Sequence, residues 1–599
     1  MSEVWRSSWG GSAAPVRKVR QDDYDLAPKT PPHSRWLRRS ELGEKFAECT
    51  FEGKDTRIEK GGYLVWCDGK QGYLDTSMGH MMVVAMTDSH KTRGELMSNL
   101  EVLSLSGESA IIHDPKGELY RHFYTRLVSR GIRVRLINYR DPVRSDCWNM
   151  LTLPYRLWKS DRSKAKSMLM DIAAILCPIE YSGDSFWSSS GQQTLLGFLY
   201  ALMERAQTEE EANVSSLVSM ILSVTKEDGS FMRFFDSFDE NSDVAIQLTS
   251  AVNNADNTRR CILGMVYNSI SKILTSDVLE EMMAVNNIDM ESLGMEQTFL
   301  FLITPDEKDT YNQMVGRFVS QTYYALIDKA QSLGGSLPVR VNILLDEFAS
   351  LGKIKDVPSM LAAGRSRNIR CMIIIQSLSQ LESVYGREAE SIRNNCSIWT
   401  YLGGRDCSFM DTLCRLCGNS ENGKPLLTPT QLMHLEKGRE AFVMVGREYP
   451  MIGRIADISE YDIEPFEFAE PALRWDRTKP KLIGKERLFK VPRQAEPDAV
   501  FRIRGDTVMI GPGMGARDEI AVAALFDSIY GTDVDVDEMD PLMDIGDALK
   551  TPVDAEWFLR SFMGLEDRDL KSFVNSLDLK DGVSKVKVRN GLRRIRSIV

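Results

Sequence analysis

The chain has 599 residues, which is too long for one hydrophobic core and indicates three or four folded units. Hydrophobic residues make up 43% and charged residues 27%, enough apolar material for a large core. The net charge of −11 excludes a surface that binds nucleic acid throughout, so any such contact has to be confined to a local basic ring or channel. There is no apolar run of about 18 residues and no signal-peptide pattern, and the ten cysteines are scattered, so we expect a reduced, cytoplasmic chain.

The first part of the chain divides into an arm and a region of alternating strands and helices. Residues 1–33 are rich in Ser, Gly, Pro and Arg and predict a disordered arm. Between 34 and 155, short apolar runs alternate with helical patterns, which favours a parallel sheet covered on both faces. The expected strands lie at 63–66, 81–86, 109–113 and 133–138, with a helix at about 91–103.

The rest of the chain predicts a sheet domain that is split by helices. Residues 156–292 have helical spacing without strand-like runs, so we expect an all-α insertion domain there. Residues 293–460 return to the strand pattern and would complete the sheet, and residues 461–599 form a helical C-terminal region. The later strands are expected at 298–303, 341–345, 371–375, 398–402 and 441–445.

One of these later strands ends in two acidic residues. The apolar run at 342–345 leads directly into Asp346 and Glu347, at the strand edge where open α/β sheets bind ligands. In a nucleotide hydrolase the first acid holds magnesium and the second polarises the attacking water. Taken alone, the pattern is equally compatible with a solvated strand end.

The segment 85–92, Ala-Met-Thr-Asp-Ser-His-Lys-Thr, stands where a phosphate-binding loop is expected. Lys91 suits the β- and γ-phosphates and Thr92 suits magnesium. Ala85 and His90 replace the glycines that let such a loop turn tightly, and Asp88 adds negative charge near a polyanion. The alternative interpretation is an ordinary strand-to-helix turn, in which Asp88 or Ser89 caps the helix.

The order of the motifs between about 34 and 455 resembles the TraG/TraD-like coupling proteins of type IV secretion and conjugation. The resemblance is specific because many short pieces recur in the same order, although no single piece decides it. The matching pieces are Gly79-His80, Asp114–Glu118 (DPKGE), Trp148–Leu151 (WNML), Asp184–Trp187 (DSFW), Asn257–Arg260 (NTRR), Leu345–Gly352 (LDEFASLG), Gly364–Ile369 (GRSRNI), Gln376–Gln380 (QSLSQ), Tyr385-Gly386, Asn394-Asn395 and Gly403–Asp406 (GGRD).

The resemblance implies an α/β fold in which a RecA-like P-loop NTPase sheet domain is interrupted by an all-α domain. It further implies a homo-hexamer that uses ATP and Mg²⁺ to move DNA, or a relaxase–DNA complex, towards membrane-embedded channel subunits. Carried over position by position, the catalytic residues would be Asp346, Glu347 and Gln376, and Thr92 with Asp346 would bind magnesium. The nucleotide-binding residues would be Thr87, Ser89, His90, Lys91 and Thr92, and the candidate arginine fingers are Arg365, Arg367 and Arg405, which we expect near the active edge of the sheet.

Two departures from the family leave alternatives open. Its members usually carry a pair of N-terminal membrane helices, and none is expected here. Either a separate membrane subunit recruits the chain to the inner face of the membrane, or the chain acts away from the envelope. The degenerate loop leaves open a non-hydrolysing docking platform in place of a motor. A DNA-packaging or helicase-type ATPase is a third interpretation, against which the pieces at 114–118 and 184–187 argue.

The remaining features give weaker indications of function. Cys414, Cys417 and nearby Cys407 lack the fourth ligand that a structural zinc needs, so we interpret them as ordinary thiols and expect no metal other than magnesium. In the C-terminal region, an acidic stretch at 531–556 precedes a basic tail at 585–596. This charge layout predicts that 461–599 recognises a partner or adaptor, although a solvated helix is the preferred explanation of the basic tail.

Overall fold

The structure is a computed structural model, and it describes most of the chain from residue 33 to residue 597. The predicted N-terminal arm lies outside the described residues except for its last position. The described ranges are 33–53, 56, 58–86, 88–179, 185–225, 229–274, 276–305, 309–355, 357–472, 479–489, 509–510, 516–530, 540–563, 565–581 and 583–597.

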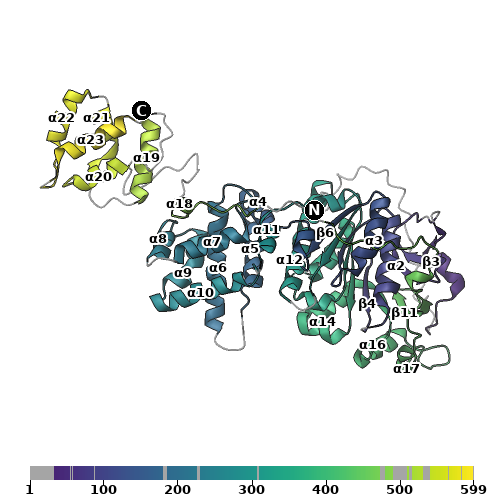
Figure 1. The fold of residues 1–599 in the computed structure, drawn as a ribbon. Helices are drawn as coiled ribbons and strands as arrows, with labels where there is room; N and C mark the ends of the chain where they lie inside the picture. Colours follow the sequence, from purple (N-terminus) through teal and green to yellow (C-terminus); the bar gives the residue numbers. More distant parts are fainter. Residues whose placement is uncertain are drawn as a thin grey trace, which may run out of the picture. The chain divides into compact units, whose positions relative to one another are not determined.

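The chain forms two compact units. The first combines Met1–Leu222 with Gln247–Ile483, and the second combines Ser223–Ile246 with Gly484–Val599. The first unit contains a nine-stranded sheet and the helices that cover it (Figure 1). The second contains a small helical cluster with a core of its own.

The large sheet has the strand order β12-β11-β10-β4-β9-β8-β5-β7-β6. The strands from β10 to β6 are parallel, whereas β11 and β12 run antiparallel at one edge. The bounds are β4 His80–Val84, β5 Ser109–His113, β6 Arg133–Asn138, β7 Thr298–Ile303, β8 Val341–Leu345, β9 Ile369–Ile375, β10 Cys396–Tyr401, β11 Glu440–Val445 and β12 Met451–Arg454.

The central strands form because they are continuous apolar runs that are buried on both faces. Every residue of β4, β5, β7, β8 and β9 is buried, as expected for parallel strands with helices above and below. Figure 1 shows α2 (Met97–Leu105) and α3 (Glu118–Ser129) together on one side of the sheet, with α12 (Asp309–Ser332) and α14 (Leu378–Tyr385) on the other. The expected strands between 81 and 445 therefore form one sheet, and the predicted fold class is confirmed.

Two further groups of strands and helices complete the first unit. A small antiparallel sheet has the order β1-β3-β2, with β1 Ala47–Thr50, β2 Tyr63–Cys67 and β3 Gln71–Asp75. The remaining helices of the sheet region are α1 Leu42–Lys45, α13 Val357–Gly364, α15 Glu388–Asn395, α16 Cys407–Cys417 and α17 Pro429–Met433.

Only helices are described between β6 and β7, the stretch in which we expected the all-α insertion. No helix among the described residues combines the length and apolarity needed to cross a bilayer. The helices of this stretch are α4 Thr152–Ser160, α5 Arg162–Leu176, α6 Ser185–Arg205, α7 Val214–Thr225, α8 Ser230–Asp236, α9 Asp243–Val252, α10 Asp256–Ser271 and α11 Asp277–Ala284.

The C-terminal region begins later in the structure than at residue 461. Tyr461 is buried in the core of the first unit, where its ring meets Phe51 at 4.7 Å between centroids, and Ile483 is still buried. The C-terminal part of the second unit therefore starts at Gly484, and Ser223–Ile246 is its other part. Its elements include α18 Lys485–Leu488, β13 Met509–Ile510, α19 Ala516–Tyr530, α20 Asp540–Ala548, β14 Val553–Asp554, α21 Ala555–Met563, α22 Asp567–Ser576 and α23 Lys585–Arg596.

A buried polar network ties together the amino ends of β5, β8 and β9. Arg370 is 0% exposed; its Nη2 lies 2.7 Å from Glu108 Oε2, and its Nε donates to Asn342 Oδ1 at 3.0 Å. Glu108 also pairs with Arg340 at 3.1 Å. Because each charged group has a partner inside the protein, the network stabilises this edge only while it remains complete.

We predict that Arg370→Met lowers the free energy of unfolding by about 3 kcal/mol, because Glu108 then loses a buried partner. The matched control is Arg133→Met, whose ion pair with Glu296 is exposed and should be worth less than about 1 kcal/mol. Urea unfolding followed by tryptophan fluorescence measures both changes. Equal losses in the two variants would contradict a special role for the buried network.

Candidate functional site

The candidate site lies at the carboxyl edge of the large sheet, where four neighbouring parallel strands end. The strands β4, β9, β8 and β5 are adjacent in that order. They lead into the loop at 85–92, Gln376, Asp346-Glu347 and Asp114, respectively. The register of parallel strands therefore gathers residues that are up to about 290 positions apart in the sequence at a single edge.

Lys91 joins the loop to the acidic pair across this edge. Its Nζ lies 2.9 Å from Asp346 Oδ1 and 3.5 Å from Glu347 Oε1. The side chains of Lys91 and Asp346 are only 13% and 11% exposed, so water screens their interaction weakly. The structure thus brings together the lysine and both acids, as the sequence predicts for a nucleotide site.

The loop keeps a glycine-like backbone without glycine. Asp88 has φ 65° and His90 has φ 62°, both in the left-handed region. Aspartate and histidine are among the non-glycine residues that occur there most often, so these replacements are the tolerable ones. Ala85 is fully buried and is not one of the residues with positive φ, so its position does not need the freedom of glycine.

The capping interpretation of the loop is wrong. The helix after the loop begins with a π-helical turn, Lys91–Leu96, whose N-cap is His90, and no side chain caps it. The hydroxyl of Ser89 is buried without a hydrogen-bond partner among the described residues. The side chain of Asp88 instead pairs with Lys437, and this hydrogen bond lowers the pKa of Asp88. The expected negative charge is therefore partly neutralised by a residue far along the chain.

The turn after β8 is also strained, and a residue at the end of the neighbouring strand β5 stabilises it. Glu347 has φ 51°, and its backbone N–H donates to Asp346 Oδ1 at 2.9 Å. The ring of His113, buried at the end of β5, places Nδ1 2.6 Å from the carbonyl oxygen of Asp346 and Nε2 3.4 Å from Thr304 Oγ1. His113 therefore supports the acidic turn, a role that sequence reasoning missed; the signal available was a polar residue ending a buried strand next to that of Asp346.

Asp114 follows His113 and is buried next to the acidic pair. It accepts a hydrogen bond from the backbone N–H of Tyr120 at 2.9 Å. Burial raises the pKa of Asp114 to about 7, and the nearby Asp346 contributes in the same direction. The carboxyl group is therefore only partly ionised at neutral pH.

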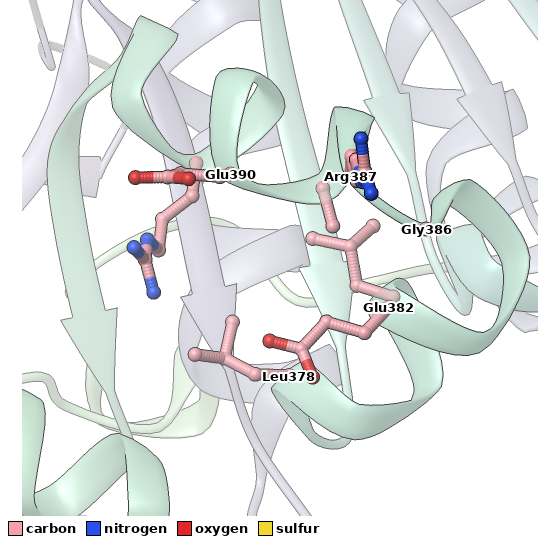
Figure 2. A pocket seen from close by; sticks show the side chains of 8 residues that line it. Leu378, Glu382, Gly386, Arg387 and Glu390 are labelled. Atoms are coloured by element: carbon pink, nitrogen blue, oxygen red, sulfur yellow. The ribbon is translucent and has the colours of Figure 1, made fainter.

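Gln376 directly follows β9, the strand between β4, which leads into the loop, and β8, which leads into the acidic pair. Its Oε1 accepts from Gln380 Nε2 at 3.4 Å, within the start of α14. Beyond it, an open pocket of about 700 Å³ lies between α14 and α15, lined by side chains such as Glu382 and Glu390 (Figure 2). Because β8 and β9 are neighbouring parallel strands, Gln376 lies at the same edge of the sheet as Asp346 and Glu347.

The predicted arginines divide between the two edges of the sheet. Arg405 follows β10 at the carboxyl edge and is exposed. Arg365 and Arg367 form the turn before β9, so their expected position near the active edge is wrong. Because β9 has seven residues, they lie at the opposite edge, about 20 Å away along the strand. The strand expected at 371–375 already follows this turn in the sequence, so the turn's position at the amino end of a strand was available without the structure.

Of the predicted magnesium residues, Asp346 and Thr92 lie at the same edge, Thr92 in the π-helical turn directly after Lys91. Thr87, predicted to bind nucleotide, lies outside the described residues. A carboxylate, a neighbouring hydroxyl residue and an acidic second residue form an oxygen-donor set that suits Mg²⁺. The described residues therefore fit the metal that the family resemblance implies.

The chain is similar to known proteins over much of its length. The family described as type IV secretory system conjugative DNA transfer matches residues 43–421, which is more than half of the sequence. The chain belongs to this family. Two relatives named conjugal transfer protein TraG, both from Escherichia coli, are 24% identical over 385 residues and 25% identical over 422 residues. These matches cover 60% and 66% of this chain but only 58% and 63% of the relatives.

Solved structures show the same fold. Relevant neighbours are the coupling protein TrwB with a non-hydrolysable GTP analogue, at TM-score 0.51 and 17% identity, and TrwB with ADP and Mg²⁺, at TM-score 0.50 and 17% identity. The first covers 74% of this chain and 99% of the solved one, and the second 74% and 98%. The α/β RecA-like P-loop NTPase fold of the family is thus present here.

The buried acid predicts a pH dependence of stability. Since the pKa of Asp114 is about 7 in the folded chain and about 4 in an unfolded one, folding retains a proton between these values. Stability is therefore lost as the pH rises from about 4 to 7. Asp114→Asn should reduce this loss by up to about 1.4 kcal/mol per pH unit, as measured by urea unfolding at several pH values. An unchanged slope would contradict the prediction.

Proposed function

We propose that the chain is a coupling ATPase, which binds ATP with Mg²⁺ and drives DNA or a relaxase–DNA complex into a type IV secretion channel. The observation that carries this proposal is the position of Lys91, within 2.9 Å of Asp346 and 3.5 Å of Glu347 at the carboxyl edge of a RecA-like sheet. An incoming triphosphate would take over Lys91 from the two acids, because it offers the lysine a higher negative charge.

Each residue at the edge has a role in this proposal. Lys91 would bind the β- and γ-phosphates, and Asp346 with Thr92 would hold Mg²⁺, which neutralises phosphate charge when bound. Glu347 would orient and polarise the attacking water, and Gln376 would sense the γ-phosphate from the adjacent strand end. TrwB, a structural neighbour, has been solved with ADP and Mg²⁺, which supports the same ligands for this chain.

A second candidate function is a docking platform that does not hydrolyse nucleotide. The replacement of the loop glycines by Ala85 and His90 favours it, and His90 holds a left-handed backbone that is costly for residues other than glycine. The platform would keep the family's substrate-handling surfaces and its recruitment to the membrane. Nucleotide turnover separates the two candidates.

We predict that Lys91→Ala abolishes stabilisation by ATP, because no other loop cation is placed for the phosphates. Glu347→Gln should retain ATP binding and reduce hydrolysis at least about 100-fold, in line with loss of a positioned base. Thermal shift and phosphate release with single- and double-stranded DNA measure the two effects. Lys45→Ala, which breaks a surface pair with Glu448, is the control. ATP binding without turnover in the native chain would favour the platform.

We further propose a ring, six-fold as in the resemblance, in which a neighbour completes each site. Arg405 is the candidate finger, because it is exposed at the carboxyl edge next to the loop. Light scattering with DNA and nucleotide should give a mass well above one chain. Arg405→Ala should leave that mass unchanged and lower turnover at least about tenfold. A strictly monomeric protein would argue against the motor.

The second unit is proposed as the region that recognises a partner or adaptor. Its last helix, α23, buries Val588, Leu592 and Ile595 and leaves Lys585 and Arg594 exposed. Part of the acidic stretch, 531–539, lies outside the described residues. Because Tyr461 belongs to the core of the first unit, the deletion that tests this role should start at Gly484.

Removal of 484–599 should leave ATP binding and ring formation intact while partner capture and DNA transfer are lost. A transfer assay with the relaxase–DNA substrate, together with a pull-down of the processing proteins, measures the loss. A truncated protein that no longer binds ATP, or one that still transfers DNA, would remove the support for this role.

A further inference from the structure

The loop at 85–92 is contacted by residues outside the family-matched range. The strands β11 and β12 form an antiparallel hairpin whose two ends meet, since the backbone N–H of Ile455 donates to the carbonyl oxygen of Arg439 at 3.1 Å. This contact brings residues 437–439 next to residues 455–457. We call these two short segments the hairpin base; both lie beyond residue 421, where the family match ends.

Asp457 of the hairpin base contacts residues on both sides of Lys91. Its two carboxylate oxygens each accept a hydrogen bond from Arg93, at 2.7 Å, and Oδ2 lies 3.5 Å from His90 Nδ1. The backbone N–H and the hydroxyl of Ser459 donate to Oδ1 at 2.9 and 2.7 Å, so the carboxylate is fixed in place. The Asp457 side chain is 16% exposed, which limits the screening of these contacts by water.

Gly438 and Lys437 make the other two contacts. A Cβ at Gly438 would lie 3.2 Å from Cγ and Cδ2 of the His90 ring, so only glycine lets the ring pack this closely. Lys437 pairs with Asp88. The two loop residues with left-handed backbones, Asp88 and His90, are thus the two whose side chains the hairpin base holds.

This coincidence has a physical consequence. A left-handed backbone costs free energy for any residue with a Cβ, so a loop of this sequence would relax if nothing opposed it. Side-chain contacts that exist only in the left-handed state favour that state. We propose that the hairpin base replaces the missing loop glycines, and that Asp457, Gly438 and Lys437 are positioning residues for the phosphate-binding backbone. The effect of the hairpin base on nucleotide binding rests on the proposed function, whereas its effect on the loop backbone does not.

The test compares variants of the hairpin base in two backgrounds. In the native background, Asp457→Asn should weaken binding of a fluorescent ATP analogue about tenfold. Lys437→Ala should weaken it about threefold, because the Lys437 side chain is 55% exposed and its pair is more screened. Lys437→Arg should restore native affinity. Glu436→Gln is the matched control, since Glu436 precedes the hairpin base and pairs with its Arg439, a contact that does not involve the loop.

The second background carries Asp88→Gly and His90→Gly. Glycine adopts the left-handed backbone without help, so the affinity of this double variant is the reference for the changes made within it. Within it, Asp457→Asn and Lys437→Ala should change affinity less than twofold. An equal loss in both backgrounds would mean that the hairpin base acts only on general stability. A tenfold loss caused by the two glycines themselves would mean that Asp88 and His90 bind the ligand. Either result overturns the proposal.

A measurement without nucleotide tests the loop directly. Hydrogen–deuterium exchange of peptides covering residues 88–92 should become at least about threefold faster when Asp457→Asn and Lys437→Ala are combined. Exchange in the buried strand β9 and in the Glu436→Gln control should stay native. Unchanged loop exchange would overturn the proposal even if ATP binds. A native chain that binds no nucleotide, but whose loop loosens as expected, would instead contradict only the proposed function.

Discussion

The contact between Lys91 and Asp346 depends on most of the tertiary structure. It joins a loop after β4 to a turn after β8, two strands that are separated in the sheet by β9. For the two side chains to meet at 2.9 Å, the three strands must end at one level, and both groups must be largely shielded from water. The ion pair therefore depends on the parallel register of these strands and on the helices that pack against them. It also leaves the lysine available for exchange towards a more highly charged anion.

Backbone strain is concentrated around this contact. Among the described residues, four other than glycine have positive φ, and three of them, Asp88, His90 and Glu347, lie at the carboxyl edge. Such conformations persist only where the surroundings oppose relaxation. Asp346 and the ring of His113 secure the acidic turn, while Asp457 and Lys437 contact the loop. The opposite edge of the sheet contains the buried network around Arg370. There the charged side chains pair with one another and join the ends of neighbouring strands.

The identity of the loop replacements matters more than the loss of glycine itself. A β-branched or bulky aliphatic residue at position 88 or 90 would oppose the left-handed backbone much more strongly than aspartate or histidine does. Both side chains are also polar enough to form the contacts that hold them, with Lys437 and Asp457. A motif comparison that only counts glycines would reject this loop, whereas its backbone is left-handed at positions 88 and 90 without glycine.

The sequence by itself determined eight of the nine strands of the large sheet, all except β12, and the positions of Asp346, Glu347 and Gln376 directly after strands. It also indicated Lys91 in the segment that follows β4. These features follow from local patterns, because a continuous apolar run predicts a buried strand and its last residue predicts the edge. Only the tertiary structure decided that Tyr461 belongs to the first core and that Asp457 and Lys437 reach the loop. Those contacts join residues more than 340 positions apart, and no local periodicity encodes which distant side chains a folded sheet brings together.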